Sequence, residues 1–331
     1  MTLAAVLAAA LAAVAAGTVA AWPDDPAYRN PVLENDAPDP AAIRAPDGTF
    51  YAYTTQSYHD AVFVNLPVLR SDDLVHWRLA GDALPDRPRW AVPGTDQGDI
   101  WAPHPVRWDG RYVLYFSART LDPGTMAIGV ATSETPTGPF VDKGEPLVVG
   151  RGFVAIDPFA TELPDGRRIL VWGSDGAPIR AQELSPDGLA LVGEPTVLLR
   201  PSGAEYEGLV EGAWLLEHGG WWYLMYSGDA CCGPEAHYAV LVARSRSPLG
   251  PYTKRGAPIL AANETSNAPG HNSTIADADG RDWMLYHAMQ RDDVTNVRYL
   301  YLDPIERRDG WPVVNDGAGP STESDEAPSV E

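Results

Sequence analysis

The sequence predicts an all-β fold, a five-bladed β-propeller in which each blade is a four-stranded antiparallel sheet. Glycine and proline occur 31 times each in 331 residues, which is too often for a protein of long helices and suits a turn-rich β architecture. No stretch after the amino-terminal leader shows helical periodicity over about ten residues or more. The third observation is a hairpin pattern that occurs five times, and it sets the number of blades.

Each copy of this hairpin consists of a short apolar strand, a turn at a glycine and a second strand rich in aromatic residues. The turn is Asp-Gly in four copies and Gly219-Gly220 in the remaining one, and these dipeptides tolerate the positive φ angles of hairpin turns. A further strand and turn follow, which completes a blade. A two-sheet sandwich would also be all-β, but a propeller, with one sheet per repeat around a central channel, accounts for the fivefold repeat. The copies are PDPAAIRAPDGTFYAYTT, WAPHPVRWDGRYVLYFSA, IDPFATELPDGRRILVWGS, EGAWLLEHGGWWYLMYSG and GHNSTIADADGRDWMLYHA.

The repeat defines a propeller domain over residues 22–314, with one further segment on either side. Residues 1–21 form an Ala/Val/Leu-rich run that ends in Val19-Ala20-Ala21, small residues of the kind that a signal peptidase accepts. Its apolar part is shorter than the ~20 residues of a membrane-spanning helix, so we expect a secretory signal peptide and a secreted protein. Residues 315–331 contain five acidic and no basic residues and predict a disordered acidic tail.

The net charge restricts the partners of the chain. It has 45 Asp and Glu against 24 Lys and Arg, a formal net charge of -21. Nucleic acids and anionic membranes bind basic surfaces, so we expect no nucleic acid partner and no membrane association after signal cleavage. We also expect a monomer. The two cysteines, Cys231 and Cys232, are adjacent. They could close a vicinal disulfide ring or remain free thiols, and the sequence leaves both open.

Five residues share one position in the repeat, eight residues before the first turn residue of each hairpin. In a propeller the innermost strands line the channel, so equivalent positions of different blades lie at one height around the axis. A single Asp before Pro is ordinarily a turn residue, but the shared register brings three carboxylates together. Carboxylates that lie close together disfavour joint ionisation, and a pair with separated pKa values is what general acid–base hydrolysis of an acetal requires. The residues are Asp39, Trp101, Asp157, Glu211 and His271.

A set of short motifs, in this order, resembles glycoside hydrolase family 43. The resemblance extends from about Asn30 to Val314 and implies a five-bladed propeller that hydrolyses arabinofuranosides or xylosides with inversion at the anomeric carbon. The motifs are Asn30-Pro31-Val32-Leu33, Pro38-Asp39-Pro40, Trp101-Ala102-Pro103, Ile156-Asp157-Pro158, Val210-Glu211-Gly212, Gly270-His271-Asn272, Asp303-Pro304-Ile305 and Asp309-Gly310-Trp311-Pro312-Val313.

Carried over residue by residue, the resemblance implies three catalytic carboxylates. Asp39 is the expected general base that activates water, and Glu211 is the expected general acid that protonates the leaving oxygen. Asp157 is expected to tune the pKa of Glu211 and to hold it in orientation. Trp101 is expected to offer a flat apolar face to a sugar ring, and Arg298 is expected near the substrate.

The histidines carry weaker expectations. The resemblance implies no cofactor for the chemistry itself, but a structural Ca²⁺ ion in the central channel beside His271. The alternative is a channel histidine that only forms hydrogen bonds, because one imidazole contributes little to calcium affinity. His287 is interpreted as structural. His104 stands where the family usually has an acidic residue, so no role is carried over to that position.

The sequence therefore predicts a secreted inverting glycosidase that cleaves α-L-arabinofuranosidic linkages in plant cell-wall arabinan or in arabinose side chains. A β-xylosidase of the same family is the nearest alternative. A propeller that binds carbohydrate without catalysis is an alternative from another class, although such a protein does not need three acids at one channel height.

Overall fold

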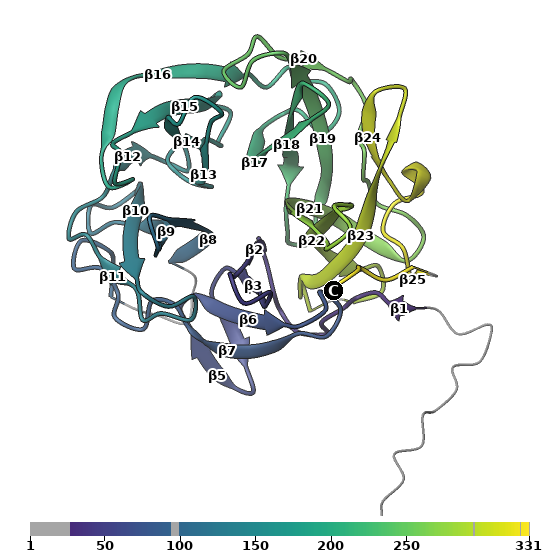
Figure 1. Ribbon diagram of the computed structural model, residues 1–331, viewed down its shortest axis with the longest axis horizontal. Helices are drawn as coiled ribbons and strands as arrows, with labels where there is room; N and C mark the ends of the chain where they lie inside the picture. Colours follow the sequence, from purple (N-terminus) through teal and green to yellow (C-terminus); the bar gives the residue numbers. More distant parts are fainter. Residues whose placement is uncertain (1–26, 94–98, 294, 325, 331) are drawn as a thin grey trace, which may run out of the picture.

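Five antiparallel sheets stand around a central axis in the computed structural model (Figure 1). The structure describes residues 27–93, 99–293, 295–324 and 326–330, so the expected signal peptide over residues 1–21 lies outside the described residues. Among the described residues no helix is long and apolar enough to span a membrane. The predicted five-bladed propeller is confirmed.

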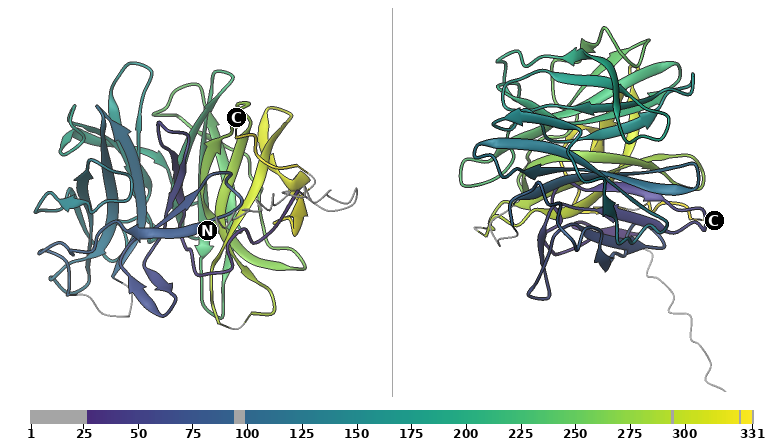
Figure 2. Two further views of the ribbon diagram at one scale, coloured as in Figure 1. Left: turned by 60° about the horizontal axis from the view of Figure 1, so that its bottom comes forward. Right: turned by 90° about the vertical axis from the view of Figure 1, so that its left-hand side faces the viewer.

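Each blade is built from one continuous stretch of chain, and its first strand lies nearest the axis (Figures 1 and 2). Blade one contains β2 (Ala41–Arg44), β3 (Phe50–Tyr53), β6 (Pro67–Ser71) and β7 (Arg78–Asp82), with β4 (Ser57–His59) and β5 (Val62–Val64) as an inserted hairpin. Blade two contains β8 (Ile100–Trp108), β9 (Arg111–Arg119), β10 (Thr125–Ser133), β11 (Val141–Asp142) and β12 (Val148–Arg151). Blade three contains β13 (Phe159–Glu162), β14 (Arg168–Trp172), β15 (Ile179–Leu184) and β16 (Leu191–Leu199). Blade four contains β17 (Val210–His218), β18 (Trp221–Ala230), β19 (His237–Ser245) and β20 (Thr253–Lys254). Blade five contains β21 (Ser266–Ala276), β22 (Asp282–Gln290), β23 (Tyr299–Arg308) and β24 (Trp311–Val314).

Blade two departs from the expected four strands. The short strand β11 pairs only with Ala131 and Thr132 of β10, which leaves the first half of β10 without an outer neighbour. The chain then returns as β12 and pairs with residues 125–128 of β10. Unpaired strand edges expose backbone donors and acceptors, and the fifth strand covers this part of the edge.

The hydrophobic core is divided into clusters that lie between neighbouring blades. One cluster joins blade one to blade two, one joins each following pair, and one joins blade five back to blade one. In that last cluster Phe50 of blade one and Trp283 of blade five are both fully buried. Burial of a large apolar side chain contributes about 1.5–3 kcal/mol, so the ring is held together mainly by apolar contacts between faces of adjacent sheets.

The segment expected to be a disordered acidic tail is, for most of its length, ordered against the propeller, and that expectation is corrected. A short 3₁₀ helix, η1, covers Asn315–Gly317, and β25 (Glu323–Ser324) pairs with β1 (Tyr28–Arg29). Further along, the backbone of Ser329 accepts a hydrogen bond from the Ala278 N–H at 2.8 Å. The acidic composition did not predict this pairing because the partner strand lies at the opposite end of the chain.

Candidate active site

The predicted site residues all line one pocket of about 400 Å³ at the axis of the propeller. The volume is within the range of about 300–1,000 Å³ that is usual for small-molecule sites. Trp101, Glu211 and His271 lie on β8, β17 and β21, and the other two register positions directly precede β2 and β13. The pocket-lining residues that the sequence predicted are Asp39, Trp101, Asp157, Glu211, His271 and Arg298.

The backbone at the shared register position is left-handed. In each blade the register residue or the residue after it has φ between 44° and 59°, which is uncommon for residues other than glycine and turns the chain sharply. Such conformations persist where the surroundings hold them in place, and they are frequent at active sites. The residues are Asp39, Ala102, Asp157, Gly212 and His271.

Most of these residues are held by a side chain at the end of the second strand of the preceding blade. Thr55 Oγ1 accepts the Ala102 N–H at 2.7 Å, and Ser117 Oγ accepts the Asp157 N–H at 3.0 Å. Ser227 Oγ accepts the His271 N–H at 2.8 Å. In blade five the hydroxyl is replaced by His287, whose Nδ1 accepts the Asp39 N–H at 3.1 Å. We call these four side chains the interblade braces.

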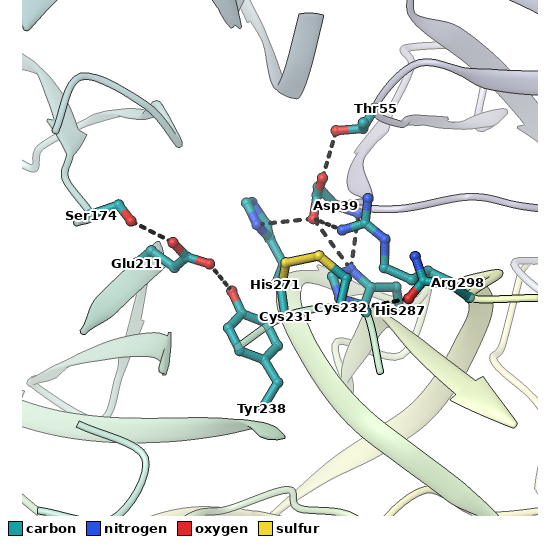
Figure 3. Close-up of a disulfide and its surroundings, with 12 residues drawn as sticks. Asp39, Thr55, Ser174, Glu211, Cys231, Cys232, Tyr238, His271, His287 and Arg298 are labelled. Carbon is teal, nitrogen blue, oxygen red and sulfur yellow. Dashed lines mark hydrogen bonds and ion pairs between the residues drawn. A yellow bond between two sulfur atoms is a disulfide. The ribbon is translucent and has the colours of Figure 1, made fainter. Parts of the chain in front are cut away.

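The third blade has no such brace, and its equivalent side chain binds Glu211 instead. Ser174, which follows its second strand, donates to Glu211 Oε2 instead of bracing a backbone N–H (Figure 3). The Gly212 N–H is held by Asp157 Oδ2 at 3.0 Å. Asp157 therefore positions Glu211 through the neighbouring backbone group, and the hydroxyl is left free to orient the Glu211 carboxyl.

Both oxygens of Asp39 are occupied. Thr55 Oγ1 donates to Oδ2 at 2.6 Å, and Arg298 Nη1 donates to Oδ1 at 3.1 Å (Figure 3). His271 Nδ1 lies 3.3 Å from Oδ1. Burial opposes ionisation of this carboxyl, but Arg298 and the imidazoles of His271 and His287 outweigh it and hold the pKa of Asp39 well below its ordinary value. Asp39 is therefore a carboxylate at any ordinary pH.

The pKa of Glu211 is shifted in the opposite direction. Tyr238 Oη donates to Oε1 at 2.8 Å, and Ser174 occupies Oε2. Burial raises the pKa of Glu211 above its ordinary value, although the two hydrogen bonds lower it in part. Burial, followed by the charges of Glu211 and Asp39, also raises the pKa of Asp157 well above the usual range. The Asp157–Glu211 pair thus retains a proton at a pH where Asp39 has lost its own.

Three histidines lie at the axis, and burial lowers the pKa of each of them. His271 Nδ1 lies between Asp39 Oδ1 and Asp157 Oδ2, at 3.3 and 3.8 Å. Burial lowers the pKa of His271, with Asp39 opposing the shift. Burial likewise lowers the pKa of His287 to about 4. His104 Nε2 donates to the Ala160 carbonyl at 3.0 Å, and its ring packs on Phe159 and Trp214. Burial lowers the pKa of His104 to about 3.

The residues around His271 do not fit a calcium ion held by protein ligands. Calcium takes about six to eight oxygen ligands. Within the described ranges no group of three or more His, Cys, Asp or Glu side chains is arranged to hold a metal ion. The carboxylate oxygens beside the His271 ring belong to Asp39 and Asp157, which have other hydrogen-bond partners. We therefore derive no step through a metal.

The pocket also has an apolar side. Trp101 and Phe153 lie with ring centroids 6.2 Å apart, and the Arg119 guanidinium covers the Trp101 ring at 5.6 Å. Phe153, between β12 and β13, is 44% exposed although it is a large aromatic. An exposed aromatic face beside carboxylates suits the apolar C–H face of a sugar.

Cys231 and Cys232 are joined by a disulfide, which decides between the two states that the sequence left open. Both residues line the same pocket, in the turn between β18 and β19. Figure 3 shows the disulfide among Glu211, Tyr238, His271 and Arg298.

Sequence reasoning missed several residues that hold the site. His287 was interpreted as structural only, but it contacts Asp39 directly. A signal for the braces was present, since Thr55, Ser117, Ser227 and His287 each lie seven residues after the turn glycine of their hairpin. Ser174 lies eight residues after its glycine, and Tyr238 and Phe153 stand outside the repeat.

Comparison with known proteins agrees with this geometry. The family model of the glycosyl hydrolases family 43 matches residues 28–312. An extracellular endo-α-(1→5)-L-arabinanase of Bacillus subtilis is 29% identical, with 75% of this chain and 79% of the relative covered. A xylan 1,3-β-xylosidase of a Vibrio species is 28% identical over 91% of this chain, which spans 60% of that longer protein. The crystal structure of an exo-1,5-α-L-arabinanase from a bovine ruminal metagenomic library superposes with a TM-score of 0.71 at 29% identity, covering 85% of this chain and 97% of that one. The matched region includes every blade and all the pocket carboxylates, and the chain belongs to glycoside hydrolase family 43.

Proposed function

We propose that this glycosidase cleaves α-L-arabinofuranosidic linkages in arabinan or in arabinose side chains, with inversion of configuration. The observation that carries the mechanism is the division of protonation states within one pocket. Asp39 is held ionised by Arg298, while Glu211 keeps its proton beside Asp157. An inverting glycosidase needs one carboxylate as base and one carboxylic acid as proton donor.

The proposed reaction is a single displacement. A water molecule attacks the anomeric carbon and gives one proton to Asp39, while the bond from the anomeric carbon to the leaving oxygen breaks. Glu211 transfers its proton to that oxygen. The products are a sugar with inverted anomeric configuration and the alcohol of the leaving saccharide. Exchange of one proton from Asp39 to Glu211 through solvent restores the starting state.

Arg298 and Thr55 support this role of Asp39 without taking part in bond breaking. Their hydrogen bonds occupy one oxygen each, which orients the remaining lone pairs. Trp101 and Phe153 form the apolar face on which we place a sugar ring. His271 lies between Asp39 and Asp157 and is proposed to keep the two carboxylates in fixed relative positions.

Arabinan is favoured as the substrate because the match to this chain covers 79% of the Bacillus endo-arabinanase and 97% of the ruminal exo-arabinanase. A β-xyloside is the second candidate, supported by the match to the Vibrio xylosidase. We further propose that the protein is secreted, as the name of the Bacillus relative says of that protein, and that it acts as a monomer.

The test is hydrolysis of a small substrate panel by the purified protein. Linear arabinan, branched arabinan, arabinoxylan, and aryl arabinofuranoside and xyloside would be compared, with product lengths measured by chromatography. We expect the arabinan substrates to be cleaved faster than the xyloside by at least about tenfold, a difference of about 1.4 kcal/mol in transition-state binding. Proton NMR of the first product formed is expected to show the inverted anomer. Retention of configuration would contradict the mechanism, and preference for the xyloside would contradict the substrate.

A further inference from the structure

The Cys231–Cys232 disulfide forms part of the wall of the catalytic pocket. Both residues line the cavity together with Asp39, Asp157 and Glu211. They lie in the turn between β18 and β19, and β18 pairs with β17, which carries Glu211. Two adjacent strands thus carry the proposed acid and lead into the turn with the disulfide, and both face the same pocket (Figure 3).

The disulfide has one buried side and one open side. Cys231 is half-buried and packs in a small apolar cluster with Tyr238, Ala268 and Met289. Cys232 is exposed, while still lining the cavity. A cystine at this place presents sulfur and methylene groups to the cavity and no hydrogen-bond donor. Sulfur is soft and polarizable and packs well on apolar surfaces.

The turn that carries the disulfide is anchored to the opposite side of the site. The Gly233 N–H donates to Asn296 Oδ1 at 2.6 Å. Asn296 lies two residues before Arg298, which binds Asp39. The ring closed by two adjacent cysteines limits the rotation of both side chains, so the apolar surface is presented in one arrangement. Such preorganisation reduces the entropy lost when a ligand is bound.

The remaining apolar groups of the cavity stand on other blades. Trp101 belongs to blade two, and Phe153 lies in the connection to blade three. The described polar groups that line the cavity are mainly carboxylates, which suit hydroxyls and not C–H groups. A sugar ring has both kinds of surface, so an apolar wall on blade four would contact a part of the substrate that the aromatic pair does not cover.

We propose that the Cys231–Cys232 disulfide is a specificity-determining contact, an apolar wall against which a sugar unit of the substrate packs. This inference rests on the proposed function, since it requires a saccharide in the pocket. An apolar contact made equally in the bound substrate and in the transition state raises KM when it is lost and leaves kcat unchanged. A disulfide that only stiffened the turn beside Tyr238 would instead disturb Glu211 and lower kcat.

The test compares KM, kcat and the pH profile of three proteins on the best substrate of the panel. They are the wild type, the Cys231→Ser/Cys232→Ser double variant, and Pro234→Ala as a control in the same turn, at an exposed residue that does not line the cavity. We expect the double variant to raise KM by about tenfold, the size of effect that a small apolar contact has in a pocket. Its kcat is expected to stay within about twofold and its pH profile to be unchanged, and Pro234→Ala is expected to behave as the wild type.

Reduction of the wild type provides the same comparison without a substitution. A dithiol transfers two electrons and two protons to the disulfide, giving two thiols and the oxidised, cyclic form of the reagent. We expect KM to rise on reduction and to return after reoxidation. An unchanged KM in both experiments, or a fall in kcat with a shifted pH profile, would overturn the inference while leaving the proposed function intact. A wild type that cleaves no member of the panel would overturn the proposed function, and the inference with it.

Discussion

At the scale of single residues, the site separates two carboxyl groups by their surroundings. Asp39 and Glu211 are both buried near the axis, so burial alone would raise both pKa values. Arg298 reverses this effect for Asp39, whereas Glu211 is bound only by the neutral hydroxyls of Ser174 and Tyr238. A cation beside Asp39 and hydroxyls beside Glu211 support the proposed assignment of Asp39 as the base and Glu211 as the acid.

The assignment predicts that the two variants Asp39→Ala and Glu211→Ala respond differently to the leaving group. A poor leaving group must be protonated, so Glu211→Ala is expected to lose about 10²–10⁴-fold in kcat on arabinan. A dinitrophenyl arabinofuranoside needs no proton, and on it the same variant is expected to approach the wild type. Asp39→Ala is expected to lose activity on both, since water must still be activated. Initial rates on the two substrates check this, with the exposed Glu145→Gln as control. Equal losses of Glu211→Ala on both substrates would refute the assignment of the acid.

A second residue-scale prediction concerns the pH profile. Activity requires ionised Asp39 and protonated Glu211, so it falls at low pH through the pKa of Asp39 and at high pH through the pKa of Glu211. The Ser174 hydroxyl stabilises the Glu211 carboxylate and lowers its pKa. Ser174→Ala is therefore expected to move the alkaline limb of kcat/KM to higher pH and to leave the acid limb in place. It also removes a hydrogen bond that orients the protonated Glu211 carboxyl, worth about 0.5–1.5 kcal/mol, and kcat is expected to fall by up to about tenfold. An alkaline limb that stays in place would show that Ser174 does not act on Glu211; Ser133→Ala, outside the pocket, is the control.

At the scale of elements, the interblade braces connect strands that share no sheet. Ser117 is fully buried at the end of β9 and its only described role is to accept the Asp157 N–H. A buried N–H left without a partner costs about 1–3 kcal/mol. Each brace therefore links the fold to the site, because the backbone groups that it holds belong to the residues that line the pocket.

Ser117→Ala is accordingly expected to lower the free energy of unfolding by about 1–3 kcal/mol. Denaturant unfolding followed by tryptophan fluorescence measures this. Ser133→Ala serves as the control, because the Ser133 hydroxyl accepts only an exposed N–H at the end of β10. A change within about 0.5 kcal/mol in both variants, the size usual for surface substitutions, would mean that water or a neighbouring group replaces the brace.

The elements also show how far the sequence predicts the structure. Equal offsets from five turns predicted which residues share the pocket, because a repeat places them at one height. The same logic, applied one strand further, would have found the braces, but not Ser174, which is displaced by one residue. Tyr238 and the disulfide turn could not be predicted in this way, since no other blade has a counterpart for them. They contribute to the pocket through contacts between strands, and the spacing of residues along the chain does not predict these contacts.

At the scale of the whole molecule, the ring closes without sharing a strand between its ends. Every blade is one continuous segment, so blade one and blade five are joined by packing and by the segments outside them. Tyr28 Oη donates to the Leu302 carbonyl at 2.8 Å, and the Asn30 amide bonds both the N–H and the carbonyl of Leu302. The C-terminal segment completes this clamp, as Thr322 accepts the Asn30 N–H and β25 pairs with β1.

A chain that ends at Pro320 is therefore expected to be less stable but equally active. It loses the hydrogen bonds that Ser321, Thr322 and Ser324 make with the amino-terminal segment and with Asp303. At about 0.5–1.5 kcal/mol for each of these four net hydrogen bonds, the free energy of unfolding is expected to fall by about 2–6 kcal/mol. None of the described residues after Pro320 lines the pocket, so kcat and KM at moderate temperature are expected to be unchanged.

Glu323→Gln separates this clamp from a charge effect. It breaks only the exposed ion pair with Arg29, whose side chains are 65% and 55% exposed, and such pairs contribute about 0–1 kcal/mol. Thermal unfolding of the three proteins would be compared under one buffer condition. A truncated chain with the midpoint of the wild type would contradict the clamp, and closure would then rest on the apolar cluster between blades five and one. A large decrease in the unfolding midpoint of Glu323→Gln would instead show that the Arg29–Glu323 ion pair provides the stabilisation. We expect the midpoint of the truncated chain to lie well below those of the wild type and Glu323→Gln, which should be nearly equal. That order would assign the stabilisation to the contacts of residues after Pro320 other than the Arg29–Glu323 ion pair.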